Sequence, residues 1–181
     1  MSPLPMDRLP PELESIPAWR STPGGYARSG CHFDLCLEAD HLLPAVRRLF
    51  DHGYFLEDIV GVDVEEGFML IYHFDRYEAA RRVALRLTVP HAAPRAPSIA
   101  AVFSGADWHE RECFDFFGVQ FENHPGLKPL LLPEDLAQHP LVKEKDRRSL
   151  YALMPLAQVV DTRDEPDTAN DSLRTVYRSA E

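Results

Sequence analysis

Proline placement divides this chain of 181 residues and limits where regular secondary structure can form. Six of the 16 prolines fall within residues 1–30, and proline interrupts the chain again from Pro125 onward. Proline lacks a backbone N–H and restricts the residue before it, which disfavours long helices and central strands. We therefore expect an extended N-terminal arm over 1–30, a folded core over 31–120, an extended partner-docking segment over 121–160 and a polar tail over 161–181.

Hydrophobic periodicity predicts the elements of the core. Apolar and polar residues alternate over 33–37 and 83–89, and two further β-type runs, 54–64 and 68–74, flank a turn at 65–67. Helical spacing predicts one helix over 42–50, capped by Asp40 and followed by Gly53, and a second helix over 106–117, ended by Gly118. This order predicts a single α+β domain with a mixed or antiparallel sheet of about four strands and two main helices.

The acidic composition and the short apolar runs argue against several classes of function. The net charge is −10, whereas binding to nucleic acid or anionic lipid needs clustered basic residues. The longest apolar run, residues 68–72, is far shorter than the roughly 20 residues that span a bilayer. The first residues lack the apolar core of a signal peptide, so we expect a chain that is neither inserted in a membrane nor exported.

The cysteine content and the missing cofactor motifs argue against further classes of function. Cys31, Cys36 and Cys113 cannot alone hold an iron–sulfur cluster, which usually takes four thiolates. An odd number of cysteines without a secretory signal favours a reducing compartment over a disulfide framework. The glycine motifs of nucleotide-binding loops and the hydrolase elbow are missing from the sequence.

Charged side chains are densest on the predicted second helix. His109, Glu110 and Cys113 resemble a His-Glu-x-x-His zinc motif, but cysteine replaces the second histidine, and a third ligand such as His124 is needed. The crowded carboxylates are also candidates for acid–base chemistry. We favour a structural role in which Arg111 pairs with neighbouring carboxylates, while the aromatic residues of the helix form core, a partner interface, or both.

The stretch ERECFDFFGVQFENHPGLKPLL resembles the signature of the thirty-kilodalton subunit family of respiratory complex I, whose bacterial members are its C-type subunits. The pattern fills every fixed position of that signature, namely Glu110, Arg111, Glu112, Asp115, Phe116, Phe117, His124, Lys128, Leu130 and Leu131. The following LLLPEDLAQHPLVKEKD resembles the continuation of the family, with Pro133, Glu134, Asp135, His139 and Pro140. A pattern of this length is specific, and we expect these residues to serve a partner interface rather than catalysis.

The resemblance implies a non-catalytic structural subunit in the peripheral arm of a proton-translocating NADH:quinone oxidoreductase. Its partners are then the large quinone-pocket subunit, of the D or forty-nine-kilodalton type, and the iron–sulfur subunits of the B and I types. FMN, iron–sulfur clusters and quinone are expected in those partners, and no cofactor or metal in this chain. The implied location is the cytoplasmic side of the bacterial inner membrane, where the chain is held through the complex.

Two alternatives stay open at the level of sequence. The same type of subunit is similar to components of energy-converting membrane-bound hydrogenases, formate hydrogenlyases and F420H2-type dehydrogenases. The other alternative is a free-standing metal-dependent enzyme that uses His109, Glu110 and Cys113.

Overall fold

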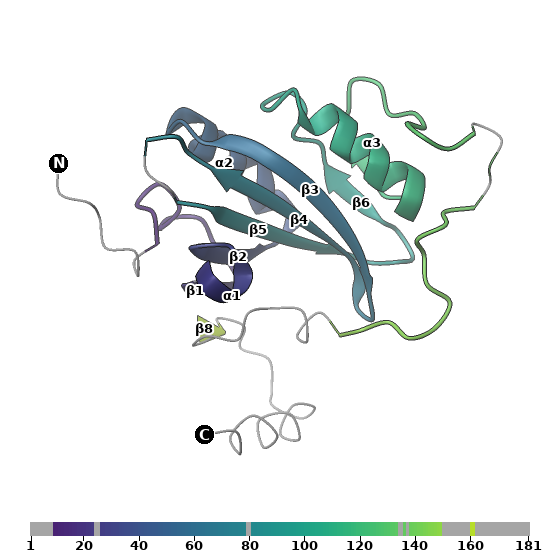
Figure 1. Ribbon diagram of the computed structural model, residues 1–181, viewed down its shortest axis with the longest axis horizontal. Helices are drawn as coiled ribbons and strands as arrows, with labels where there is room; N and C mark the ends of the chain where they lie inside the picture. Colours follow the sequence, from purple (N-terminus) through teal and green to yellow (C-terminus); the bar gives the residue numbers. More distant parts are fainter. Residues whose placement is uncertain are drawn as a thin grey trace, which may run out of the picture.

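The computed structural model of the chain describes residues 9–23, 26–78, 81–133, 136, 138–149 and 160–161. Figure 1 shows the arrangement of its elements. In chain order these are β1 (Arg20–Pro23), α1 (Tyr26–Ser29), β2 (Phe33–Leu37), α2 (Ala39–Asp51), β3 (Phe55–Val64), β4 (Gly67–Asp75), β5 (Val83–Val89), β6 (Arg95–Pro97), α3 (Ala106–Phe117), β7 (Gln120–Glu122) and β8 (Val160–Asp161). None of the described helices has the length and apolar character needed to cross a membrane.

The main sheet has the order β3-β4-β5-β2-β1-β8. Its four longest strands are those predicted, and β2 and β5 run parallel while the other neighbouring pairs run antiparallel. The predicted α+β fold with two main helices and a mixed sheet is confirmed. The short parallel pair β6–β7, which the sequence did not indicate, forms a second small sheet beside α3.

The N-terminal segment differs from the extended arm that was expected over 1–30. Strand β1 pairs with β2, and α1 follows it. Leu13 and Ile16 are buried in the hydrophobic core. The edge of β2 offers backbone hydrogen bonds to this segment, and the core offers apolar contacts. Both are tertiary effects, so the proline content of the segment does not indicate them.

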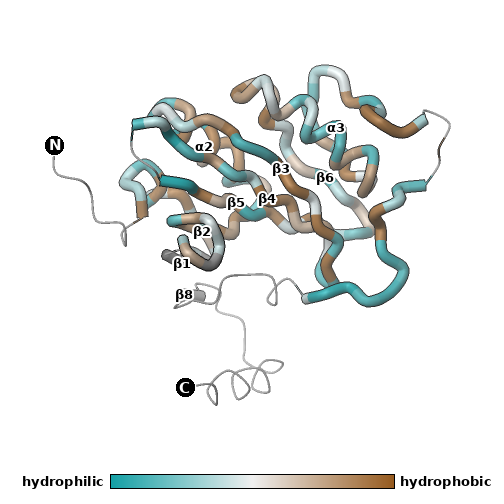
Figure 2. Tube along the Cα trace, viewed as in Figure 1, coloured by the Kyte–Doolittle hydropathy of each residue, from teal (hydrophilic) through white to brown (hydrophobic). Residues whose placement is uncertain are grey.

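Both main helices cover the same face of the sheet. Alternate residues of β2, β4 and β5 join one hydrophobic core with the apolar sides of α2 and α3. In Figure 2 brown, apolar residues alternate with teal and white ones along the strands, in contrast to the largely teal, hydrophilic stretch over 143–149. Asp40 does not cap α2, because the helix already begins at Ala39 with Glu38 as its N-cap and no side chain caps it.

The opposite face of the sheet holds a buried ion pair. The guanidinium of Arg86 on β5 donates to both carboxylate oxygens of Asp34 on β2, at 2.7 to 2.9 Å. A smaller apolar cluster that includes Cys36, Met69 and Ala84 lies on this face. Strands β2 and β5 are therefore buried on both faces, and the paired charges can stay there because each satisfies the other.

Gly61 on β3 allows α3 to pack closely against the sheet. A Cβ atom at this position would lie 2.6 Å from the ring of Phe117. Gly61→Ala is therefore expected to lower the free energy of unfolding by about 2 kcal/mol, measured by urea denaturation, because the aromatic ring must move from its packed position. Gly105→Ala is the control, since nothing lies within 4 Å of its added Cβ. Equal losses in the two variants would contradict this packing.

Candidate functional site

Helix α3 and the segment that follows it hold most of the residues singled out from the sequence. The helix runs alongside β3, and residues 118–133 turn back past its outer side (Figure 1). Gly118 ends the helix with φ +76°, as predicted, which is a conformation that favours glycine. The helix thus forms a rigid base on which an otherwise irregular segment can be fixed.

Glu110 connects α3 to the turn after β6. Its carboxylate is fully buried and accepts hydrogen bonds from the Ser98 hydroxyl at 2.6 Å and from the Ile99 backbone N–H at 2.7 Å. Burial raises the pKa of Glu110 from its ordinary value to about 7, the two hydrogen bonds oppose this rise, and the charge of Asp107 adds to it. Glu110 is therefore a structural anchor with an unusual protonation equilibrium.

Asp115 binds the backbone of the segment that follows the helix. One carboxylate oxygen accepts hydrogen bonds from the N–H groups of Leu130 and Leu131, each at 2.7 Å, and of Leu132 at 3.2 Å. The side chain of Asp115 is almost completely buried. A carboxylate that accepts several backbone N–H groups fixes an irregular backbone which no strand or helix could satisfy.

Arg111 complements this arrangement from the preceding turn of α3. Its guanidinium donates to the backbone carbonyls of Lys128 at 3.1 Å and Pro129 at 3.0 Å, and lies 3.7 Å from Asp107. The predicted ion pairing of Arg111 with neighbouring carboxylates is thus found with Asp107. Arg111 binds carbonyl groups of the stretch 128–132, and Asp115 binds its N–H groups. Together the two side chains hold this stretch against the helix.

His124 lies next to the buried carboxyl of Glu110. Its Nδ1 accepts from the backbone N–H of Gly126 at 3.0 Å, so its Nε2 carries the proton in the neutral tautomer. That Nε2 is 3.3 Å from a carboxylate oxygen of Asp107 and 3.8 Å from one of Glu110. The histidine fixes the turn after β7, as its position before proline suggested, and adds a titratable group to the cluster.

The C-terminal end of α3 is capped by a more distant part of the chain. The Nδ1 atom of His139 lies 2.7 Å from the backbone carbonyl of Asp115, and the N–H of Leu141 donates to the carbonyl of Phe116. The last carbonyls of a helix have no partner within it, so residues 139–141 supply what the helix lacks.

Asp63 is a buried anchoring residue that the sequence analysis missed. Its buried carboxylate accepts from the Lys143 backbone N–H and from the Arg147 side chain, and His91 lies 2.7 Å away. Burial favours a higher pKa for Asp63, but these hydrogen bonds outweigh it and lower the pKa. The available signal was an aspartate with a valine on each side, within the apolar run that ends the strand.

The signature residues fall into three groups in the structure. Those that brace the chain internally are Glu110, Arg111, Asp115, His124 and His139, and Phe117 joins the core. Those that are exposed or half-buried are Glu112, Phe116, Lys128, Leu130, Leu131, Pro133 and Pro140. Glu134 and Asp135 lie outside the described residues. The interface role of these residues stays a prediction.

The zinc-like trio is not assembled as a metal site. No group of three or more histidine, cysteine or acidic side chains in the described part of the chain has metal-binding geometry. Glu110 is engaged with the turn after β6, whereas His109 and Cys113 line a groove beside β3. Burial, with the charges of Glu112 and Glu110, raises the pKa of Cys113 to about 12, so its thiol stays protonated at neutral pH.

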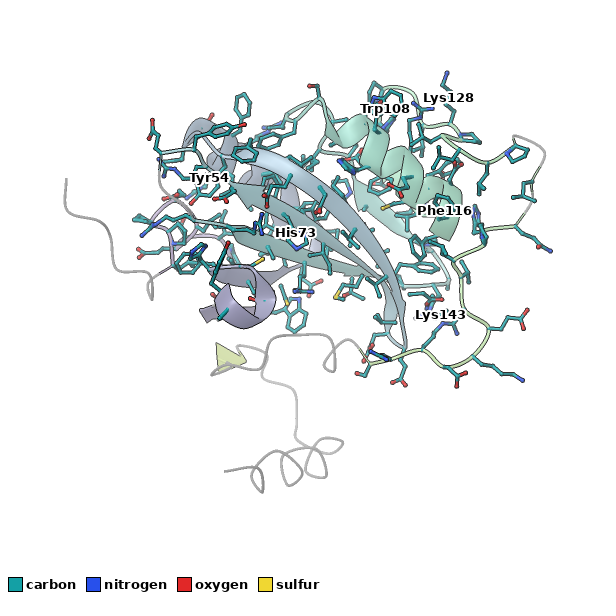
Figure 3. The ribbon with its side chains drawn as sticks, viewed as in Figure 1. Tyr54, His73, Trp108, Phe116, Lys128 and Lys143 are labelled. Atoms are coloured by element: carbon teal, nitrogen blue, oxygen red, sulfur yellow. The ribbon has the colours of Figure 1, made fainter. Side chains whose placement is uncertain are left out.

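Large apolar side chains remain exposed on and after α3. Trp108 is 63% exposed and Leu131 is 67% exposed, and the Arg111 guanidinium lies over the indole ring. Figure 3 shows Trp108 and Lys128 at the same end of α3, with Phe116 at the other end. We call this set the α3 apolar surface, consisting of Trp108, Leu131, Leu136, Leu141 and Val142.

Two solved structures are similar to this chain. An archaeal membrane-bound sulfane sulfur reductase, a respiratory membrane complex, contains a chain that is 23% identical, with a TM-score of 0.62, covering 86% of this chain and 92% of that one. A trypsin-resistant fragment of Nqo5 is 27% identical with a TM-score of 0.48, covering 59% of this chain and 88% of that one. The first of these likenesses supports the fold, and at this identity only the fold.

Relatives matched by sequence indicate the family more specifically than the solved structures do. The C subunit of the NADH-quinone oxidoreductase of Roseiflexus castenholzii is 40% identical over 94 residues, which is 50% of this chain and 54% of that protein. The alignment therefore spans about half the length of that relative. Its counterpart in Herpetosiphon aurantiacus is 38% identical over 120 residues, which is 61% of this chain and 70% of that protein. Residues 35–150, more than half of the chain, match the model of the respiratory-chain NADH dehydrogenase 30 kDa subunit, and the chain belongs to that family.

Proposed function

We propose that this chain is a non-catalytic structural and assembly subunit in the peripheral arm of a proton-translocating NADH:quinone oxidoreductase. The observation that carries the proposal is the family match over 35–150. The geometry agrees with it, because the polar signature residues Glu110, Arg111 and Asp115 bind the chain's own backbone. These contacts fix the segment after α3 against the helix. Large apolar side chains of the helix and of that segment stay exposed to solvent.

The α3 apolar surface is the proposed site of contact with partner subunits. Aromatic residues at the centre of an interface commonly dominate its binding energy, and Trp108 is the largest exposed side chain of α3. The partners in this proposal are the large quinone-pocket subunit and the iron–sulfur subunits of the B and I types. FMN, clusters and quinone belong to partner subunits, and the complex holds this chain at the cytoplasmic face of the inner membrane.

The relatives belong to different kinds of respiratory complex, so they do not agree on the electron donor of the parent complex. The curated relatives are NADH-quinone oxidoreductase subunits, whereas the archaeal chain of the same fold belongs to a sulfane sulfur reductase. The relatives with higher sequence identity favour NADH.

Gentle purification from the native host tests this function. The full chain is tagged, membranes are solubilised, and the co-purifying proteins are identified, with optical spectra and NADH:quinone activity measured on the same fraction. Recovery with a flavin- and cluster-containing membrane assembly that oxidises NADH is expected. An assembly without flavin or NADH activity would indicate that the parent complex is a hydrogenase-like or sulfur-reducing one instead. Recovery alone from the soluble fraction, with metal that is lost on Cys113→Ala, would overturn the structural role.

Trp108→Ala is expected to lower the recovery of partner subunits on the tagged chain about tenfold or more, because it removes a large exposed aromatic anchor. Tyr77→Ala is the matched control, since Tyr77 is 89% exposed and belongs to the turn after β4 rather than to α3. Neither variant should change thermal unfolding of the full chain by much, because both side chains already face solvent. Undiminished recovery with Trp108→Ala would remove this residue from the interface.

A further inference from the structure

Strand β3 is an edge strand of the main sheet, and among the described residues its outer side is paired only at one end. There, Val64 forms a parallel bridge with Arg148, and the N–H of Glu65 donates to the carbonyl of Arg148. Over 56–62, no backbone hydrogen bond joins β3 to any described segment other than β4. An edge of this kind is a template for a further strand.

A groove lies between this open edge and α3. We call it the edge groove, and its volume is about 360 Å³. Its lining comes from residues 58–61 on β3, from one side of α3, and from Leu141. The register with β4 places Val60 on the sheet face opposite α3, where it is 39% exposed. An added strand would therefore place alternate side chains beneath α3 and beside Val60.

Among the described residues, the features that usually keep an edge strand from pairing with another strand lie at the two ends of β3. A β-bulge lies between Leu56 and Asp58, and Glu57 there is paired with Arg82 on the far side of β4. Arg148 covers the other end. The intervening residues 59–62 contain no charge and no proline, which are the devices that ordinarily prevent pairing.

The charge of the edge groove selects its occupant. Asp58 and Glu112 are its acidic lining residues, and no lysine or arginine is among the residues that line it. Asp58 also lies 2.5 Å from the imidazole of His73, and Glu112 has no such contact with the other lining residues. A second copy of this chain would bring the same acidic residues together across the new pair. Residues 151–181 carry six acidic and three basic side chains, so this chain's own C-terminal part is repelled as well.

We propose that the edge groove binds an extended segment of another subunit, which adds to β3 as a strand and carries both apolar residues and lysine or arginine. Backbone hydrogen bonds to 56–62 supply affinity. Phe116 and Glu112 lie on the α3 side, and Val60 and Asp58 lie on the opposite face, so each face of the added strand meets one apolar and one acidic side chain. This inference rests on the proposed function, since the segment belongs to a neighbour in the parent complex.

Site-directed photo-crosslinking in the native host tests the proposal. A benzophenone amino acid replaces Val60 in the full tagged chain, and the cross-linked peptide is sequenced by mass spectrometry. The expected product is a peptide of another subunit that contains both apolar and basic residues, which is missing when the probe replaces Tyr77. A cross-link to a second copy or within the chain, a partner peptide without both kinds of residue, or no cross-link would overturn the proposal.

Two lysine substitutions separate the two levels of inference. Val60→Lys adds a like charge opposite the basic residues of the segment and is expected to lower recovery of the parent assembly at least tenfold, whereas Tyr77→Lys, which places the same charge on an exposed residue outside the edge groove, leaves it unchanged. Thermal unfolding of each full-length variant reports whether the fold persists. If the unmodified chain fails to co-purify with an assembly, the proposed function fails. If it co-purifies and Val60→Lys does so equally well, only the strand at β3 is lost.

Discussion

Replacing Asp115 with alanine is expected to lower the free energy of unfolding by about 3 kcal/mol and to release residues 128–132 from α3. In the native chain one carboxylate oxygen accepts three backbone N–H groups, and no other described side chain accepts a hydrogen bond from them. Alanine removes the acceptor and its charge at a nearly buried position. The change is measured by urea denaturation and by hydrogen exchange at Leu130 and Leu131.

Two further variants make the Asp115 prediction specific. Asp115→Asn keeps an oxygen acceptor without the charge and should retain part of the stability, since hydrogen bonds to charged groups are the stronger ones. Glu112→Ala lies on the same helix but is exposed, and it should change the free energy of unfolding by less than about 0.5 kcal/mol. Native protection of Leu130 and Leu131 in Asp115→Ala would show that the carboxylate does not hold this segment.

The sequence predicted the regular elements well because their periodicity is local. Helix α3 begins and ends where spacing and Gly118 placed it, and the alternation over 83–89 matches β5. Strands β1 and β6 are too short for a period to develop, and they exist because a neighbouring strand offers partners. Residue pattern alone therefore could not indicate them.

The signature positions were also found from the sequence, but their contacts were not. The sequence predicted an ion-pair network of Arg111 with neighbouring carboxylates, among them Asp115. In the structure each of them binds the backbone of 128–132 instead. That backbone has no regular partner because proline interrupts it, and its unpaired N–H and C=O groups attract the charged side chains. This competition depends on tertiary structure, which the spacing of the residues does not encode.

Glu110→Gln is expected to change how stability depends on pH. The native carboxyl keeps its proton up to about pH 7, whereas in the unfolded chain it loses the proton near its ordinary value of 4.5. Between these values the unfolded state binds fewer protons, so the free energy of unfolding falls as the pH rises and levels off above pH 7. The loss from this one group is about 3 kcal/mol, and glutamine, which does not titrate, should abolish it.

The surroundings of Glu110 decide how this measurement is made. Asp107 on the same helix and His124 after β7 lie near the carboxyl, and Tyr72 on β4 interacts with it electrostatically, so Glu110 is compared with a variant that changes this group alone. The difference between wild type and Glu110→Gln, from urea denaturation at pH 5 to 8, isolates the contribution of Glu110. Glu112→Gln removes an exposed carboxylate from the same helix and should leave the slope unchanged. A difference that stays constant across this range would mean that the buried carboxyl is ionised throughout, and that Ser98 and Ile99 satisfy its charge.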